Sequence, residues 1–222
     1  MLDMVHRKGD LTSTCRWKTS SAMSKPELTY FVARGRAEPV RMCYSLKGVE
    51  WDEKQPDRKV MHTDKETYPY GQVPRLVDGD VTVLQSLAIL RHVGRKLDLY
   101  GKSDADAARI DSLLDGLEDM RNKTRTLVYG TGLSPDGFRH YVKTVLKPPP
   151  LPQASTGGSV MAIFEKFTTE LNGSYYCKSG ISIADIALAN MVDCHLPLFP
   201  SHMNAFPALL AHHKKTMAEK GE

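Results

Sequence analysis

The sequence contains no apolar run that approaches the ~18 to 20 residues a helix needs to span a membrane. Its four cysteines form no C-x-x-C pair, and no group of cysteines and histidines has zinc-finger spacing. Basic residues exceed acidic residues by only 4, and no block of lysine and arginine with interleaved aromatics concentrates that charge. We therefore expect no membrane span, no metal site, no nucleic-acid partner and unpaired thiols. The cysteines are Cys15, Cys43, Cys177 and Cys194.

What is present is ordinary globular composition: of 222 residues, 41% are hydrophobic and 25% are charged. Residues 1–22 differ from the rest, because they scatter lysines and arginines among serines and threonines without a periodic apolar pattern. They lack the hydrophobic region of a secretory signal, and Asp3 and Asp10 count against a mitochondrial transit peptide. We expect residues 1–26 to be a disordered extension and the protein to be cytoplasmic.

The segment 27–100 has the pattern of a compact α/β unit. A β-branched and aromatic run indicates the first strand, and Gly48 is placed to end the first helix. Asp78-Gly79 between two apolar runs indicates a hairpin, and Ser86 is placed to cap the next helix. The expected elements are a strand over 28–32, a helix over 36–47, a strand over 50–54, a hairpin over 73–84 and a helix from 86 to about 97.

The segment 101–222 reads as helix only. Ser103-x-x-Asp106 resembles a capping box, and a second box at Ser182-x-x-Asp185 precedes an apolar run. A proline- and glycine-rich loop separates the two over 147–158. The expected helices run from about 104 to 128, over 135–146, over 160–171, from 183 to about 191 and over 205–217.

Five segments carry more information than this architecture. In chain order they read YFVARGRAEPVRM (30–42), YGQVPRLVDGD (70–80), LQSLAILRHVGRKLDLYGK (84–102), DGLEDMRNK (115–123) and SIADI (182–186). Together they resemble the tyrosine-type glutathione transferases, most closely the Pi class and next the Sigma class. The resemblance implies a thioredoxin-like domain of βαβ-ββα order over 27–100 and an all-helical domain over 101–222. It also implies an enzyme that conjugates glutathione, its co-substrate, to hydrophobic electrophiles in detoxification, with no further cofactor.

The chemistry of thiols indicates the role that the resemblance implies for the segment 30–42. A free thiol has a pKa of about 8.5, so only about 3% is thiolate at neutral pH, and the thiolate is the nucleophile. A tyrosine hydroxyl that donates a hydrogen bond to sulfur favours the anion. Tyr30 matches the tyrosine of the family, and Arg36 matches an arginine that supports the thiolate, so both are expected to be catalytic. Without the resemblance, Tyr30 reads as a core aromatic and Arg36 as a surface ion-pair residue.

The resemblance also implies a set of glutathione contacts. In the family the loop before the hairpin holds a cis-proline, so that the preceding residue pairs with glutathione like an added strand. A serine at the next helix N-terminus offers backbone N–H groups to the γ-glutamyl carboxylate. The matching residues are Gln72, Val73, Pro74, Gln85 and Ser86.

Two further contacts concern the charged ends of glutathione. Lys65 matches the lysine that holds the glycyl carboxylate, although Lys59 stands where the family has a tryptophan. Asp119 matches the acid that reaches the γ-glutamyl amine from the neighbouring subunit; alone it reads as a solvated helix charge. In the electrophile site, Phe31, Arg34 and Tyr129 match family positions, and Tyr129 is equally readable as a helix-end aromatic.

A homodimer is expected on two grounds, although the sequence leaves a heterodimer open. The helix after Ser86 is basic and the long helix is acidic, which suits a two-fold interface. Tyr70 matches the aromatic residue that enters a hydrophobic pocket of the partner. The expected interface residues are Tyr70, Arg91, Arg95 and Asp115.

Two alternative functions remain open at this point. One is a glutathione-dependent isomerase of the Sigma type, a prostaglandin D synthase, in which the same thiolate adds reversibly. The other is a non-catalytic ligand-binding member of the superfamily, which Tyr30 and Arg36 disfavour. A thioredoxin-type disulfide oxidoreductase is disfavoured because no C-x-x-C follows the first strand.

Overall fold

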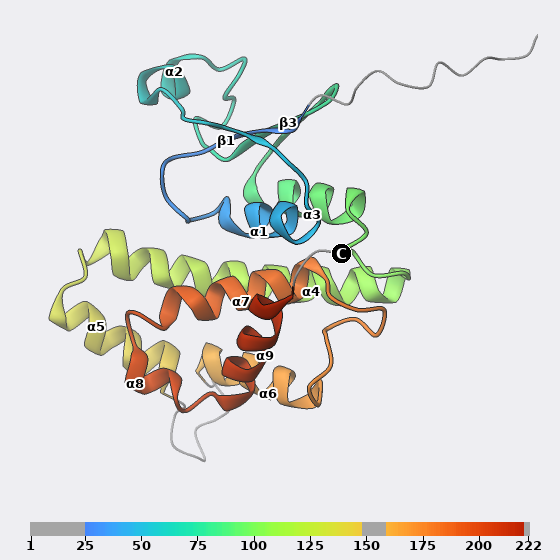
Figure 1. Cartoon of the computed structure of the whole chain (residues 1–222). Coiled ribbons are helices and arrows are strands. Elements are labelled where there is room, and N and C mark those ends of the chain that lie inside the picture. Colours follow the sequence, from blue (N-terminus) through green and yellow to red (C-terminus); the bar gives the residue numbers. More distant parts are fainter. Residues whose placement is uncertain (1–24, 148–158, 220–222) are drawn as a thin grey trace, which may run out of the picture.

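The computed structural model describes residues 25–147 and 159–219. The expected extension lies outside these ranges up to residue 24, and so does the proline-rich loop from residue 148. The described chain forms a sheet with its helices, stacked on a larger layer of helices from the second half of the chain (Figure 1). Within the described ranges, no helix is both long and apolar enough to cross a bilayer.

The sheet contains four strands in the order β2-β1-β3-β4. Strand β1 pairs in parallel with β2, where Leu28 lies opposite Glu53, and antiparallel with β3, where it lies opposite Leu76. The β3–β4 hairpin turns at Gly79, as its sequence predicts. The strands are β1 (Glu27–Thr29), β2 (Asp52–Lys54), β3 (Arg75–Asp78) and β4 (Val81–Leu84).

Strand β1 is shorter than the expected 28–32. The backbone N–H of Tyr30 still donates to the carbonyl of Lys54 at 2.9 Å, but the chain then leaves the sheet. Val32 is 83% exposed as a result. The apolar run therefore continues past the end of the strand, and Tyr30 and Phe31 line a surface groove instead of extending the sheet.

Three helices accompany the sheet: α1 (Glu38–Leu46), α2 (Arg58–Thr63) and α3 (Ser86–Lys96). Helix α2 was not expected, because its six residues are too few to show a periodic pattern and only Met61 is buried. It is held by Asp57, whose side chain accepts hydrogen bonds from the N–H groups of Lys59 and Val60.

The second half contains α4 (Asp104–Arg125), α5 (Pro135–Tyr141), α6 (Val160–Glu170), α7 (Ile183–His195), α8 (Pro200–Met203) and α9 (Pro207–Ala218), with π-helical turns η1 (Thr126–Gly130) and η2 (Val142–Leu146). Ser103 caps α4, and the predicted capping box of Ser182 and Asp185 starts α7. The expected last helix begins at Pro207 instead of residue 205, because the proline occupies its first turn and disfavours helical backbone at the preceding Phe206; Pro200 starts a separate short helix before it.

Helix α7 joins the two halves. It packs against α1 and α3 on one side and against α4 and α9 on the other. A Cβ atom on Gly94 of α3 would lie 2.8 Å from the Ile183 side chain, so this close approach requires glycine. The backbone N–H of Ile183 also donates to the carbonyl of Leu99 at 2.9 Å. The surface between the halves is therefore fixed in position, and the candidate site lies along it.

Candidate active site

Tyr30 is oriented by the turn that leads into α1. Its hydroxyl oxygen accepts a hydrogen bond from the backbone N–H of Arg36 at 3.0 Å. Gly35 makes this possible: its φ is +45°, and a Cβ atom there would lie 2.6 Å from the hydroxyl oxygen. Because the Tyr30 oxygen accepts this bond, its own proton is left to donate to a group in the cavity.

Arg36 bridges the two halves of the chain. Its guanidinium makes two hydrogen bonds to the Glu118 carboxylate on α4, at 2.9 and 2.7 Å. It also lies 3.3 Å from the Ser86 hydroxyl at the start of α3. A bidentate arginine–carboxylate pair fixes geometry as well as charge. The site is therefore assembled from the turn between β1 and α1, the start of α3, and α4.

One cavity of about 260 Å³ lies between Arg36 and the cis peptide bond of Val73–Pro74. The Gln85 side-chain amide donates to the Gln72 amide oxygen at 3.3 Å across it. Gln85 has a φ of +71°, a conformation that is uncommon for a non-glycine residue and typical of binding sites. The sequence-predicted residues that line this cavity are Arg36, Tyr70, Gln72, Val73, Pro74, Gln85 and Ser86.

Two predicted glutathione contacts do not line this cavity. The Lys65 ammonium group lies beside Gly71, where a Cβ atom would approach it to 3.2 Å. Asp119 is exposed on α4 and faces a different hollow with Asn122 and Lys123. Glu118, its neighbour, is the acid that turns inward.

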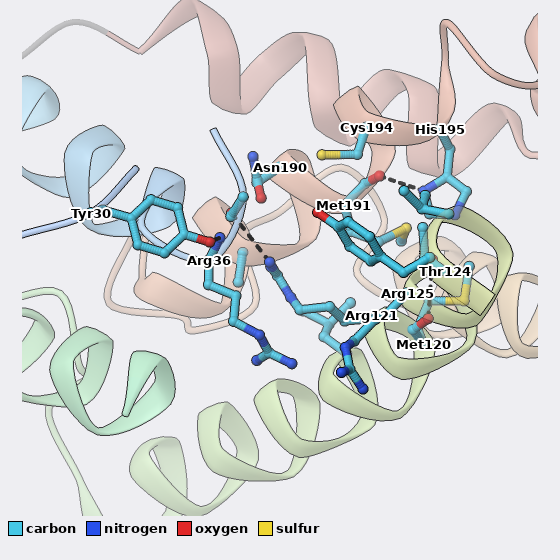
Figure 2. Close-up of a pocket in the computed structure, with 15 residues that line it drawn as sticks. Tyr30, Arg36, Met120, Arg121, Thr124, Arg125, Asn190, Met191, Cys194 and His195 are labelled. Carbon is cyan, nitrogen blue, oxygen red and sulfur yellow. Dashed lines mark hydrogen bonds between the residues drawn. The ribbon is translucent and has the colours of Figure 1, made fainter. Parts of the chain in front are cut away.

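A second cavity of about 280 Å³ lies between the turn that follows β1, α4 and α7 (Figure 2). Tyr30 and Arg36 line it, and so does the predicted Tyr129, which is 81% exposed. Its apolar wall consists of Leu117, Met120, Val128, Ala187 and Met191, and its polar wall adds Arg121, Thr124, Arg125, Asn190, Cys194 and His195. We call it the electrophile cavity below.

Phe31 and Arg34 do not reach this cavity. They line a separate open groove with Glu38 and Glu53, on the opposite side of Tyr30. The Arg58 guanidinium lies over the Phe31 ring at 4.8 Å. Arg34 forms ion pairs with Asp193 and, at 3.4 Å, with Glu38. Its charge is therefore engaged before any ligand arrives.

The thiols of the described residues are not activated. Burial raises the pKa of the Cys194 thiol and, to an extreme degree, that of Cys43, which is 0% exposed. Burial likewise lowers the pKa of His195, whose Nε2 atom lies 2.7 Å from the Tyr141 hydroxyl. Cys43 is fully enclosed, and at Cys194 burial outweighs the nearby positive charges of Arg34 and Arg121, so neither has the lowered pKa of a catalytic thiol.

The sequence matches two family models, the glutathione S-transferase N-terminal domain over residues 26–95 and the C-terminal domain over residues 153–221. The chain is 35% identical to "Glutathione S-transferase P" of Bos taurus over 189 residues, which cover 83% of each chain. It belongs to the glutathione S-transferase family. The protein of the same name from Homo sapiens is also 35% identical, over 192 residues and 83% of each chain.

The solved structures include a similar Pi-class glutathione S-transferase from Onchocerca volvulus, with a TM-score of 0.76, 29% identity and 88% of each chain covered. The expected fold is therefore confirmed: a small mixed sheet with helices followed by a helical half. This chain is a glutathione transferase of the tyrosine type and resembles the Pi class, as its motifs predict.

In this transferase, the charges expected to join two subunits are paired within one chain. Arg91 contacts Asp111 at 2.5 Å and Asp115 at 2.7 Å. The Arg95 guanidinium lies over the Tyr100 ring at 4.5 Å. Charge complementarity between α3 and α4 is therefore used inside the chain and no longer argues for a dimer. Tyr70 remains 62% exposed.

Sequence reasoning missed most of the polar wall of the electrophile cavity in this transferase. Asn190 lies within the apolar run of α7 and is 1% exposed. Arg121 and Arg125 of α4 line the same cavity. One signal was available: Asn190 is a polar residue inside IADIALANMV, where every neighbour is apolar except the capping aspartate.

Proposed function

We propose that this transferase detoxifies hydrophobic electrophiles, and that Tyr30 holds the sulfur of glutathione as the thiolate that attacks them. The observation that carries this proposal is the hydrogen bond from the Arg36 N–H to the Tyr30 oxygen at 3.0 Å. A phenol that already accepts one bond presents its proton to the sulfur. Donation to the charged form lowers a thiol pKa, so more of the nucleophile is present at neutral pH.

The cavity beside Ser86 is the proposed glutathione site. The N-terminus of α3 supplies backbone N–H groups and partial positive charge to the γ-glutamyl carboxylate. Gln72 and Gln85 border the same space, and Val73 offers its backbone to the peptide part of the ligand. We place Lys65 near the glycyl carboxylate and Asp119 in the site of a neighbouring subunit.

The electrophile is proposed to bind in the electrophile cavity, against Leu117, Met120 and Met191. Tyr30 lines this cavity while Arg36 lines both cavities, so a sulfur held by Tyr30 faces the apolar side. Binding both reactants side by side makes the attack effectively unimolecular. Tyr129 stands at the rim, where its hydroxyl can assist the leaving group. Phe31 and Arg34 act only from the adjoining groove.

We further propose a cytoplasmic homodimer in which Tyr70 enters a hydrophobic pocket of the second copy. An exposed aromatic side chain at the edge of a binding site suits such a contact. Sedimentation of the purified protein tests it: the wild type is expected at twice the mass of Tyr70→Ala. A wild type that sediments as a monomer overturns the dimer and leaves the catalytic proposal in place.

The catalytic proposal is tested with purified protein, glutathione and a chlorodinitrobenzene. Calorimetry measures glutathione binding, and the appearance of the thioether measures conjugation. Tyr30→Phe is expected to bind glutathione but to conjugate it at least about tenfold more slowly, because it lacks one charge-assisted hydrogen bond to the sulfur. Equal rates for the two proteins would remove Tyr30 from the mechanism.

A further inference from the structure

Cations outnumber anions on the walls that face the two cavities. The basic residues are Arg36, Arg121 and Arg125, and the acidic residue is Glu118. Arg36 forms hydrogen bonds with both oxygens of Glu118, so this carboxylate does little to neutralise Arg121 and Arg125. The region is thus electropositive before any ligand binds, and an apolar cavity strengthens that field.

Arg121 is held in place but not neutralised. It donates to the carbonyl of Gly35 at 3.2 Å, and its Nε lies 3.9 Å from Glu118. Burial lowers the pKa of Arg121, and the positive charge of Arg36 lowers it further. Both causes disfavour a cation at this position and would be relieved by an anion in the cavity.

Arg125 stands one helical turn further along α4 and lines both cavities. Among residues 25–147 and 159–219, it has no carboxylate within 4.0 Å and no hydrogen-bond partner for its side chain. Arg34 differs, because Asp193 and Glu38 already pair with it.

Asn190 supplies the second, independent observation. It is 1% exposed, and neither atom of its amide has a hydrogen-bond partner in the described part of the chain. A buried amide without a partner is costly and is uncommon in folded proteins. Figure 2 shows its side chain directed toward the same space as Tyr30 and Arg121. A ligand that fills this space would complete its hydrogen bonds.

We infer that the electrophile cavity selects electrophiles that carry a carboxylate and an acceptor oxygen on an apolar body. The guanidinium groups of Arg121 and Arg125 bind the carboxylate, and the amide of Asn190 donates to the acceptor oxygen. Leu117, Met120 and Met191 contact the apolar body. This inference rests on the proposed function and names its substrate class.

Chlorodinitrobenzoate has this chemistry, and its methyl ester is the neutral counterpart. The glutathione thiolate attacks the ring carbon that bears chlorine; a carbon–sulfur bond forms, and chloride leaves with the electrons of the broken carbon–chlorine bond. The thiol proton has already gone to solvent. The net reaction therefore requires only glutathione and the aryl chloride. Each enzymatic kcat/KM is divided by the uncatalysed rate constant of the same compound, which removes the difference in intrinsic reactivity.

The wild type is expected to favour the acid over the ester on this corrected scale. Arg125→Leu should lower the acid-to-ester ratio about fivefold, which is typical of a partly exposed charge contact. Lys123→Leu is the matched control, because it removes the same charge from α4 outside both cavities and should keep the wild-type ratio. A ratio that Arg125→Leu leaves unchanged overturns the inference. This includes an equal fall in kcat/KM for both compounds, which would mean that the arginine acts on the thiolate and not on the carboxylate.

Asn190→Leu has a different expected signature. Both compounds carry nitro oxygens, so both should lose about threefold to tenfold, the range for a hydrogen bond between neutral groups. The melting temperature should rise, because an unpaired buried amide is replaced by an apolar side chain. A lower melting temperature would mean that the Asn190 amide stabilises the fold, and would refute its proposed role in binding the acceptor oxygen.

Binding without catalysis separates this inference from the proposed function. Dinitrobenzoate without chlorine cannot react, and calorimetry measures its affinity in the absence of glutathione. If the acid binds more tightly than its ester and Arg121→Leu removes this difference, the substrate class stands even where conjugation fails, because Arg121 lines only the electrophile cavity. If both bind equally while conjugation proceeds, the proposed function stands and the selection for a carboxylate is wrong.

Discussion

Replacing Tyr30 by phenylalanine removes one oxygen atom from the wall of the electrophile cavity. The ring keeps its contacts with Phe31 and with the Arg41 guanidinium, whose centroid distances are 5.8 and 5.7 Å. The Arg36 N–H loses its acceptor, but Gly35 and the Arg36–Glu118 pair still hold the turn. The variant should therefore fold and still bind glutathione.

The size of the effect follows from that geometry. A hydrogen bond to a charged group is worth ~1.5 to 3 kcal/mol, and one unit of pKa corresponds to about 1.4 kcal/mol. Losing the Tyr30 hydroxyl should thus raise the pKa of the bound thiol by about 1 to 2. At a pH below the pKa of the thiol bound to the wild type, the thiolate fraction and the rate at low electrophile concentration should both fall about 10- to 100-fold.

Ultraviolet titration of bound glutathione measures this directly, since the thiolate absorbs where the thiol does not. Tyr175→Phe is a suitable control: it removes a hydroxyl that contacts Glu219 and lines neither cavity, and its curve should match the wild type. A Tyr30→Phe curve that coincides with the wild type would refute the role of this hydroxyl, even if the rate falls.

Three other results are expected. Gly35→Ala should reduce conjugation at least about tenfold, because its Cβ would meet the Tyr30 hydroxyl at 2.6 Å; unaltered kinetics would contradict this orientation. Asp185→Asn should lower the free energy of unfolding by ~3 kcal/mol in denaturant titrations, since a buried, fully bonded carboxylate is lost. Because burial lowers the pKa of His195 in the folded state, this histidine is protonated in the unfolded state first as the pH falls. The melting temperature should therefore decrease as the pH falls below about 6.5, and it should decrease less in His195→Gln.

Local signals predicted much of the fold. The capping box at Ser182 and the hairpin at Asp78-Gly79 are where the sequence puts them, because side chains within four residues decide both. Helix α2 escaped prediction, since its six residues show no apolar repeat, and the helix expected to run to about residue 128 changes to a π-helical turn at Thr126, which the apolar pattern does not distinguish from α-helix. The end of strand β1 depends on where the chain must leave the sheet, which is a tertiary constraint.

The site divides in the same way. Tyr30 and Arg36 lie together as their shared motif predicts, because six residues and one glycine turn connect them. Glu118 and Asn190 come from α4 and α7, and only the packing of those helices on the first half brings them to the cavities. The helical pattern of α4 alone did not distinguish the inward Glu118 from the outward Asp119.

In the mechanism proposed above, the pair between Arg36 and Glu118 makes thiol activation depend on both halves of the chain. A nascent polypeptide that has emerged only as far as Gly101 carries Tyr30 and the loop of Val73, yet it lacks the carboxylate that anchors Arg36. Proteolysis between α3 and α4 would likewise separate the arginine from its anchor once the halves part. Turnover of glutathione therefore reports that both halves are present and docked.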